Sequence, residues 1–238
     1  MCFLIHKERL DIVHNQILTA YTLDFAKHIS SKDIPRLQRL WQNIQDNLAK
    51  EDRKFKYSLI ERNARGREYE NSVEWLVLSG LATRVYEVNT PRLPLSSVKR
   101  SNAFKLYLSD SGLLRTKFRL APTTILLGNR LFTEFKGVLT ENYVLQTLVR
   151  QFGNDIFYWT SGNQAEVEFL FQQSERYNLK ALLFLQEERG KRSVLTSKTR
   201  FANPLKTNHS TEFSYSLPRA FLSIREYLNF LSSFAKLS

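Results

Sequence analysis

Apolar side chains recur at helical spacing in several stretches of this 238-residue chain. The clearest stripe has an apolar residue every three or four positions and consists of Leu37, Leu40, Trp41, Ile44 and Leu48. Such spacing places these side chains on one face of a helix. Asp33 is a residue type preferred at a helix N-cap, and Pro35 fits the first turn, where its missing N–H needs no partner. The pattern therefore predicts a helix that starts directly after Asp33.

Four other stretches have helical periodicity and predict helices at Asp11–Ile29, Ala64–Ser79, Leu131–Phe152 and Ile224–Phe234. In the second of these, Tyr69, Val73 and Leu76 form the inner face, and Gly80 is a typical stop signal. The third is the longest predicted helix of the chain.

Runs of apolar and aromatic residues bounded by turn residues predict strands. They cover Leu81–Val88, Ala103–Leu108, Ile156–Thr160, Glu166–Phe171 and Leu179–Leu185. A polar tip at residues 96–101 separates the first two strands. We expect the last strand to pair with the one before it, because its large apolar side chains need burial. The stretch from Glu187 to Lys206 is expected to be a mobile loop.

These elements predict an α+β protein with two domains. Helices followed by a hairpin with a basic tip have the order of a winged helix, although other α+β domains share this order. We place a helical and winged-helix-like domain at residues 1–110. Residues 111–238 are expected to form a second, α/β domain.

Several classes of protein are excluded by the sequence. No run of about eighteen apolar residues occurs, and charged residues interrupt the apolar stretch Met1–Ile5, so we expect no membrane span and no signal peptide. A cytoplasmic protein with no membrane partner is expected. The single Cys2 cannot form an internal disulfide, and no Cys/His cluster has the spacing of a zinc site. No Ser/His/Asp arrangement can be inferred around the scattered histidines.

The net charge of +12 is large and unevenly distributed. Residues 1–120 hold 21 Lys and Arg against 13 Asp and Glu, a balance of +8, and the remaining residues carry +4. A positive field attracts polyanions through the release of condensed counterions, so nucleic acid is the first partner to consider and an anionic membrane surface the second. Charge alone fits an ordinary basic protein equally well.

A resemblance to a known family is found in five stretches, at residues 33–36, 64–70, 75–81, 104–114 and 131–145. They resemble a large family of uncharacterised bacterial and archaeal proteins in which an AAA-type ATPase domain precedes a C-terminal domain of unknown function. The most specific stretches are Phe104-Lys105-Leu106-Tyr107 and Thr133-Glu134-Phe135-Lys136-Gly137. The resemblance runs from about residue 11 to about residue 172. It implies that this chain is the C-terminal remnant of such a protein.

The chain departs from that family at the nucleotide site. No Gly-x-x-x-x-Gly-Lys-Ser/Thr loop occurs, so the backbone cradle and the lysine that hold nucleotide phosphates are absent from the sequence. We expect no ATP binding or hydrolysis by the family's mechanism. A separate ATPase subunit is therefore a partner that the resemblance implies.

The family's C-terminal domain is similar to the PD-(D/E)xK nuclease fold, in which a helix glutamate, a strand aspartate and a strand Glu-x-Lys hold a divalent metal. The resemblance assigns catalytic roles to Glu141, Glu168 and Lys180, with Glu141 and Glu168 as Mg²⁺ ligands. Glu168 stands in place of the aspartate, and Asn178 in place of the Glu of Glu-x-Lys. Two anions instead of three hold Mg²⁺ weakly, so we expect a degraded site. The alternative is a weak Mg²⁺-dependent nuclease.

Five basic residues are candidate DNA contacts: Arg62, Arg65 and Arg67 at the start of a predicted helix, and Lys99 and Arg100 at the wing tip. Residues at a helix N-terminus reach the major groove in helix-turn-helix docking, and a basic wing reaches phosphates or the minor groove. One alternative is that Arg65 and Arg67 form surface ion pairs with Glu68 and Glu70. Another is a protein-docking surface made of Trp41, Trp75 and the apolar residues Met1, Phe3, Leu4 and Ile5. The sequence predicts a non-catalytic DNA-binding protein.

Overall fold

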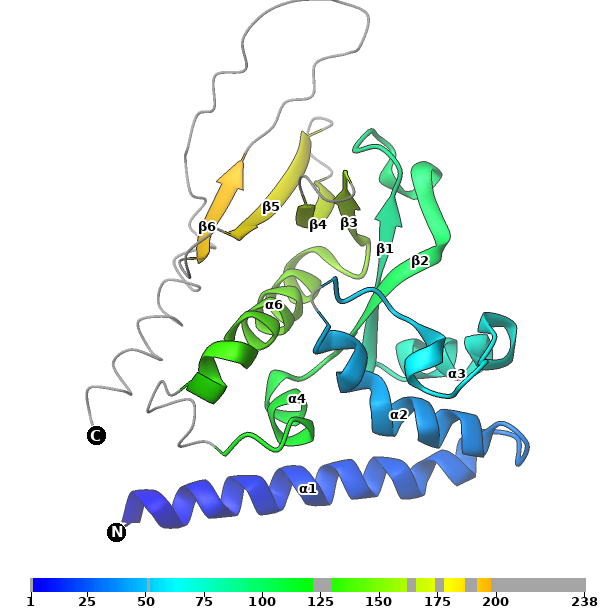
Figure 1. The fold of residues 1–238 in the computed structure, drawn as a ribbon, viewed down its shortest axis with the longest axis vertical. Helices are drawn as coiled ribbons and strands as arrows, with labels where there is room; N and C mark the ends of the chain where they lie inside the picture. The colour runs from blue at the N-terminus through cyan, green and yellow to red at the C-terminus, as the bar shows by residue number, and fades with distance from the viewer. Residues whose placement is uncertain are drawn as a thin grey trace, which may run out of the picture. The chain divides into compact units, whose positions relative to one another are not determined.

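The computed structural model describes residues 2–50, 52–121, 130–161, 166–173, 178–186 and 192–197. These residues form the mixed α+β structure that the sequence predicts (Figure 1). They divide into two compact units. Of the described residues, the first unit contains those up to Arg84 and Lys105–Gln146, and the second contains Val85–Phe104 and those from Thr147 onward. The predicted division between residues 110 and 111 falls inside the first unit.

The first unit is built mainly on helices, with α1 at Cys2–His28, α2 at Ile34–Leu48, α3 at Gly66–Leu78 and α4 at Ser111–Lys117. A short 3-10 helix, η1, spans Tyr57–Leu59. α2 packs against α1 and α3, and α4 packs against α1 (Figure 1). The helix predicted at Asp11–Ile29 is confirmed, although it begins earlier in the chain. None of the helices in the described part of the chain is long and apolar enough to cross a membrane.

α2 confirms the predicted apolar stripe, because Leu37, Leu40, Trp41, Ile44 and Leu48 are all buried. The helix starts directly after Asp33, as expected, but Asp33 makes no side-chain capping bond. Its backbone is in the α region (φ −94°, ψ −17°), whereas the capping geometry requires extended backbone. The Asp33 carboxylate instead accepts a hydrogen bond from the Ser30 hydroxyl at 2.7 Å.

Aromatic rings join α1 to α2 and α3. Trp41 is 2% exposed, and its ring meets Tyr21 and Phe25 of α1 edge to face at centroid distances of 6.1 and 5.8 Å. Phe25 also meets Trp75 of α3 at 5.3 Å. Edge-to-face pairs at such distances are favourable. The hypothesis that Trp41 forms a docking surface is wrong, because these rings cover it. The side chains of residues 1–8, assigned to the same surface, lie outside the described residues.

α3 confirms the predicted inner face, since Tyr69, Val73 and Leu76 are at most 1% exposed. At the start of the helix, the Glu68 carboxylate accepts a hydrogen bond from the Arg65 backbone N–H at 3.2 Å. At its end, Gly80 has a φ of +73°, the left-handed conformation that glycine adopts readily. Both ends of α3 therefore follow from local sequence signals.

His14 of α1 lies at the contact between α1 and α4. Its Nδ1 is 3.1 Å from the Thr116 hydroxyl and 3.4 Å from Nη2 of Arg115. Burial and the Arg115 guanidinium lower the pKa of His14, while the carboxylates of Asp110 and Asp11 oppose this effect. The contact between the two helices therefore favours the neutral imidazole.

We expect His14 to make the protein less stable as the pH falls through 6.5, the ordinary pKa of histidine. Below that pH the unfolded chain takes up a proton that the folded state binds less readily, so the free energy of unfolding decreases. The variant His14→Gln should lose less stability over this range in thermal unfolding. His28→Gln, at an exposed histidine of the same helix, is the control. Identical pH profiles for wild type and His14→Gln would contradict this assignment.

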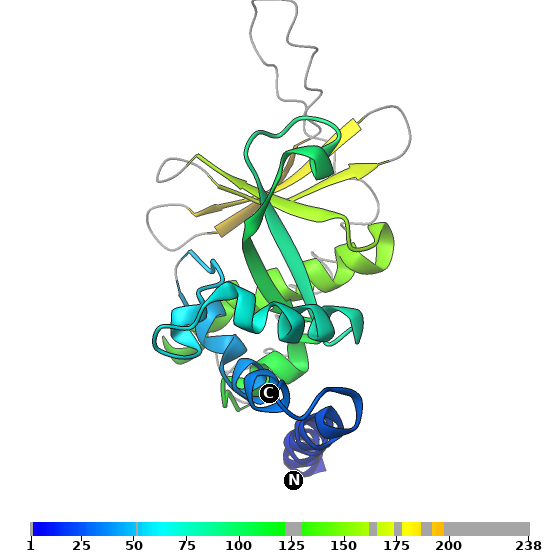
Figure 2. The ribbon, with the colours of Figure 1, turned by 90° about the vertical axis from the view of Figure 1, so that its right-hand side faces the viewer.

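The second unit is built on a sheet of six strands among the described residues, in the order β2-β1-β3-β4-β5-β6. The strands are β1 at Ala82–Val88, β2 at Lys99–Leu108, β3 at Ile156–Thr160, β4 at Glu166–Gln173, β5 at Asn178–Gln186 and β6 at Arg192–Ser197. β1 pairs with β3 in parallel, and β3, β4, β5 and β6 pair antiparallel in chain order (Figure 2). Parts of β1 and β2 also belong to the first unit.

The strand predictions are confirmed, including the pairing of β5 with β4. The prediction that residues 187–206 form a loop is wrong for β6, which pairs with β5 over its whole length. β5 presents a row of backbone N–H and C=O groups at its outer edge, and β6 supplies partners for them. The closing helix predicted at Ile224–Phe234 and the rest of that loop lie outside the described residues.

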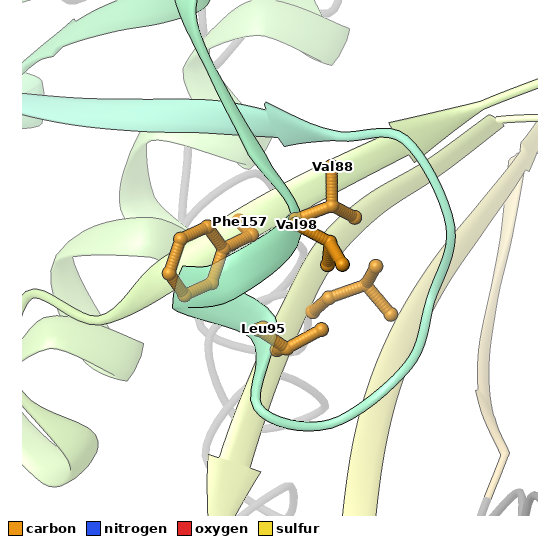
Figure 3. Close-up of a cluster of buried hydrophobic side chains, with 5 residues drawn as sticks. Val88, Leu95, Val98 and Phe157 are labelled. Carbon is orange, nitrogen blue, oxygen red and sulfur yellow. The ribbon is translucent and has the colours of Figure 1, made fainter.

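The connection between β1 and β2 is packed against the sheet. It contains a 3-10 helix, η2, at Leu95–Val98. The side chains of Leu95 and Val98 are buried in a cluster with Val88, Phe157 and Leu170 (Figure 3). The sequence predicts Lys99 and Arg100 at a wing tip, whereas in the structure they are the first two residues of β2. Burial of Leu95 and Val98 explains this difference, because it holds the connection on the sheet.

The long helix α6 spans Arg130–Phe152, close to the predicted bounds. Apolar residues of its predicted inner face are buried, including Val138, Leu145 and Leu148. In the second unit, the ring of Phe152 stacks on Phe171 of β4 at a centroid distance of 4.4 Å. The same helix carries Glu141, the first of the predicted metal ligands.

Candidate functional site

Glu141 of α6 is a buried carboxylate, only 1% exposed. Its Oε1 lies 3.0 Å from Nη1 of Arg53, and its Oε2 accepts a hydrogen bond from the Tyr107 hydroxyl at 3.4 Å. Arg53 and Tyr107 are buried as well. A charge removed from water requires a hydrogen-bonded partner of opposite charge, and Arg53 is that partner.

Arg53 reaches Glu141 from the loop between α2 and η1. Its φ is +47°, a left-handed conformation that is uncommon for residues other than glycine. Beside it, the Lys56 backbone N–H donates to Oδ1 of Asn47 at 2.6 Å, and the Lys56 ammonium pairs with Asp52 at 2.8 Å. These contacts hold the loop in a conformation that places the guanidinium inside the unit.

Lys105 of β2 is a second buried cation, 0% exposed. It precedes Tyr107 by two residues, so both side chains lie on the same face of the strand. Since Tyr107 contacts Glu141, this is the face of β2 that meets α6. We refer to Arg53, Lys105, Tyr107 and Glu141 as the buried charge cluster.

Sequence reasoning found Glu141 but missed the other members of the buried charge cluster. A signal existed for Lys105, because a lysine within the apolar strand Ala103–Leu108 is seldom buried without a partner. Arg53 lies in a basic stretch where the sequence does not distinguish it from Lys54 and Lys56. Nothing local marks it as the partner of a helix residue far along the chain.

The donor set around Glu141 does not fit the Mg²⁺ ion that the nuclease resemblance implies. Mg²⁺ requires several oxygen ligands in near-octahedral geometry. One oxygen of Glu141 faces a guanidinium and the other a hydroxyl donor. In the described part of the chain, no group of three His, Cys, Asp or Glu side chains is arranged to hold a metal ion.

The other predicted catalytic residues, Glu168 and Lys180, lie in the second unit. Glu168 of β4 is 6% exposed. Lys180 of β5 pairs with Phe171, three residues along β4 from Glu168, and Asn178 pairs with Gln173. Positions three apart on a strand belong to alternate faces. The register therefore does not bring position 168 beside position 178 or position 180. The side chains of Asn178 and Lys180 lie outside the described residues.

Arg62, Arg65 and Arg67, which we call the arginine patch, are exposed at the start of α3. None of them forms an ion pair with another described residue. The alternative pairing with Glu68 and Glu70 does not form: Glu68 accepts from a backbone N–H, and Glu70 pairs with Arg84 at 2.7 Å. The three guanidinium groups are therefore exposed and form no ion pair with a carboxylate of the described chain.

Glu61, the other carboxylate beside the arginine patch, is also engaged. It accepts a hydrogen bond from the Tyr69 hydroxyl at 2.6 Å and pairs with Arg39 at 2.7 Å. The Tyr69 hydrogen bond and the Arg39 charge lower the pKa of Glu61. This carboxylate is thus directed toward α2 and α3 and does not neutralise the arginine patch.

Lys99 and Arg100 have contacts within the second unit. The Lys99 amine lies 4.7 Å from the ring centroid of Tyr86, and Nη1 of Arg100 lies 2.9 Å from Oε1 of Glu87. Glu87 is 4% exposed and also accepts a hydrogen bond from the Tyr158 hydroxyl at 3.0 Å. Arg100 therefore stabilises a buried carboxylate. Of the two residues, Lys99 is the better candidate for contact with an external anion.

Comparison with known proteins identifies one protein family. A protein-family model matches residues 4–124, about half of the chain, and the family is described as a domain of unknown function (DUF8612). No curated protein and no solved structure matches the chain. The matched region contains the arginine patch, Arg53, Lys105 and Tyr107, whereas Glu141, Glu168 and Lys180 lie outside it.

Proposed function

Because the chain belongs to the DUF8612 family, whose function is unknown, we propose a function from its own residues: it is a non-catalytic DNA-binding protein. The arginine patch is the observation that carries this proposal. Three exposed guanidinium groups stand at the start of α3, while Glu61, Glu68 and Glu70 hold other partners.

The physical chemistry of the arginine patch suits a phosphate backbone. The planar guanidinium offers paired N–H donors that match phosphate oxygens. The patch lies at a helix N-terminus, the end of a helix that carries the positive partial charge. Lys99 is a further candidate contact in the second unit. Contacts of this kind give affinity that falls steeply with salt and depends little on base sequence.

We further propose that the chain contains a winged-helix-like part and a part related to the PD-(D/E)xK nuclease fold. The succession of α2, α3, β1 and β2 supports a winged-helix-like arrangement, although β1 pairs with β3 in a larger sheet. The succession of α6, β3, β4 and β5 supports a relationship to the PD-(D/E)xK nuclease fold. In this proposal the protein is a cytoplasmic relative of AAA-type ATPases that retains DNA binding and lacks catalysis.

Removing the arginine patch should weaken DNA binding roughly tenfold or more and flatten its salt dependence. The test variant is Arg62→Ala/Arg65→Ala/Arg67→Ala, and the probe is a fluorescein-labelled duplex followed by anisotropy. Each lost phosphate contact lowers the slope of log K against log salt by about 1, so we expect a total decrease of about 3. Titrations at several salt concentrations measure both effects.

The matched control removes three positive charges elsewhere. Arg9→Ala/Lys32→Ala/Lys136→Ala changes exposed residues by the same total charge. If the two triple variants bind equally, the attraction is a property of net charge and the arginine patch is not the interface. Absence of binding at low salt would reject the proposed function altogether.

A protein-docking role is the second candidate, and a specific feature favours it. A pocket of about 450 Å³ in the first unit is lined mostly by apolar and aromatic side chains, including Tyr21, Phe25, Trp75 and Leu78. Leu78, which lines this pocket, is 79% exposed. A separate ATPase subunit is the partner that this candidate implies. Absence of DNA binding at low salt, which rejects the first proposal, would leave docking as the remaining candidate.

A further inference from the structure

We propose that the Arg53 guanidinium permanently occupies the cation position at Glu141 and thereby excludes a divalent metal ion from this carboxylate. The proposal deepens the non-catalytic part of the proposed function and rests on it. It assigns Arg53 as an internal replacement for the metal that a nuclease-like site would require.

Geometry is the first support. Arg53 Nη1 lies 3.0 Å from Oε1 of Glu141, and the Tyr107 hydroxyl donates to Oε2. For a metal ion to coordinate Glu141, it must displace the guanidinium from a carboxylate that is only 1% exposed. The displaced guanidinium would lose the Glu141 carboxylate while remaining inside the protein, since Arg53 is only 8% exposed. Both steps are unfavourable because they leave a charge buried without its partner.

The charge balance is the second support. Lys105 is fully buried on the same face of β2 as Tyr107, so a second cation lies on the face that meets Glu141. The Lys105 ammonium adds positive charge on this face, and added positive charge disfavours a divalent cation there.

The third support is the backbone of Arg53. Its φ of +47° is a conformation that a non-glycine residue adopts only when surrounding contacts hold it. The Arg53–Glu141 ion pair is one such contact, so the loop conformation and the ion pair stabilise each other.

The first test is a double-mutant cycle on folding. Arg53→Met and Glu141→Gln should each lower the temperature of thermal unfolding, because each removes one member of a buried ion pair and leaves the other charge in place. The double variant should unfold at a higher temperature than either single variant, since it removes both charges. If the double variant loses the sum of the two single losses, the ion pair does not exist and the proposal is overturned.

The second test is Mn²⁺ binding, followed by the electron paramagnetic resonance signal of the free ion. We expect wild type and the double variant to give the same result: either no saturable binding, or binding that Glu141 does not contribute to. Stoichiometric binding by wild type that is lost in the double variant would overturn the proposal. Neither test involves DNA, so their outcome is independent of whether the arginine patch binds DNA.

Discussion

Replacing Trp41 with alanine should lower the free energy of unfolding by about 3–5 kcal/mol, the range for truncation of a large buried aromatic side chain. The indole is 2% exposed and contacts Tyr21 and Phe25 of α1. The Lys117 ammonium lies 4.6 Å from its ring centroid. Truncation therefore leaves a cavity between α1 and α2 and also removes a cation–π contact. Urea unfolding followed by circular dichroism measures the loss.

The control for this prediction is Leu23→Ala on α1. Leu23 is 69% exposed, so its truncation should change the free energy of unfolding by no more than about 0.5 kcal/mol. A Trp41→Phe variant should recover part of the loss, because a smaller ring keeps some edge-to-face contacts. If Trp41→Ala is as mild as Leu23→Ala, α1 does not cover Trp41 in solution, and the docking role returns as an explanation for this residue.

The second large effect concerns Lys117 at the end of α4, and it depends on pH. Burial lowers the pKa of Lys117 from 10.5 to about 8, with partial compensation from the Asp46 charge. The ammonium donates a hydrogen bond to the Trp41 carbonyl oxygen. Between pH 8 and 10.5 the unfolded chain holds a proton that the folded protein has released. The free energy of unfolding should therefore rise across this window, by on the order of 2–3 kcal/mol.

Lys117→Met is the variant that isolates this effect. Methionine keeps much of the side-chain volume and carries no charge, so the rise between pH 8 and 10.5 should be much smaller than in wild type. At neutral pH the variant should be no less stable than wild type, because wild type then holds a charged lysine in a buried position. Lys27→Met, at a lysine whose side chain is 71% exposed, is the control. Equal pH profiles for Lys117→Met and wild type would show that Lys117 is solvated.

Local patterns along the chain were sufficient for most elements of the fold, although not for α4 or β6. The stripe on α2, the inner face of α3 and the stop at Gly80 are each set by residues within a few positions of one another. The spacing of apolar residues decides whether a segment buries a helical face or a strand face, so it can be read without the partner. The pairing of β5 with β4 followed for the same reason, from a run of apolar residues that needs burial.

Much less of the candidate site could be predicted from the sequence. The position of the arginine patch could be predicted, because arginines at the start of a predicted helix can be recognised in the sequence. That these arginines form no ion pairs within the described chain could not be predicted. It depends on the pairing of Arg84 with Glu70 and on the hydrogen bond from Tyr69 to Glu61. The parallel pairing of β1 with β3 and the packing of Leu95 against the sheet were likewise outside the reach of local patterns.

The sequence by itself determined most of the helices and strands, the faces that they bury, and that the chain carries a strongly positive charge. Only the tertiary structure decided what the charged groups do. Glu141 looked like a metal ligand by resemblance, yet its partner is Arg53, 88 positions earlier in the chain. Periodicity reports on neighbours three or four residues away, whereas the role of a carboxylate depends on the charges that folding brings within a few ångströms of it.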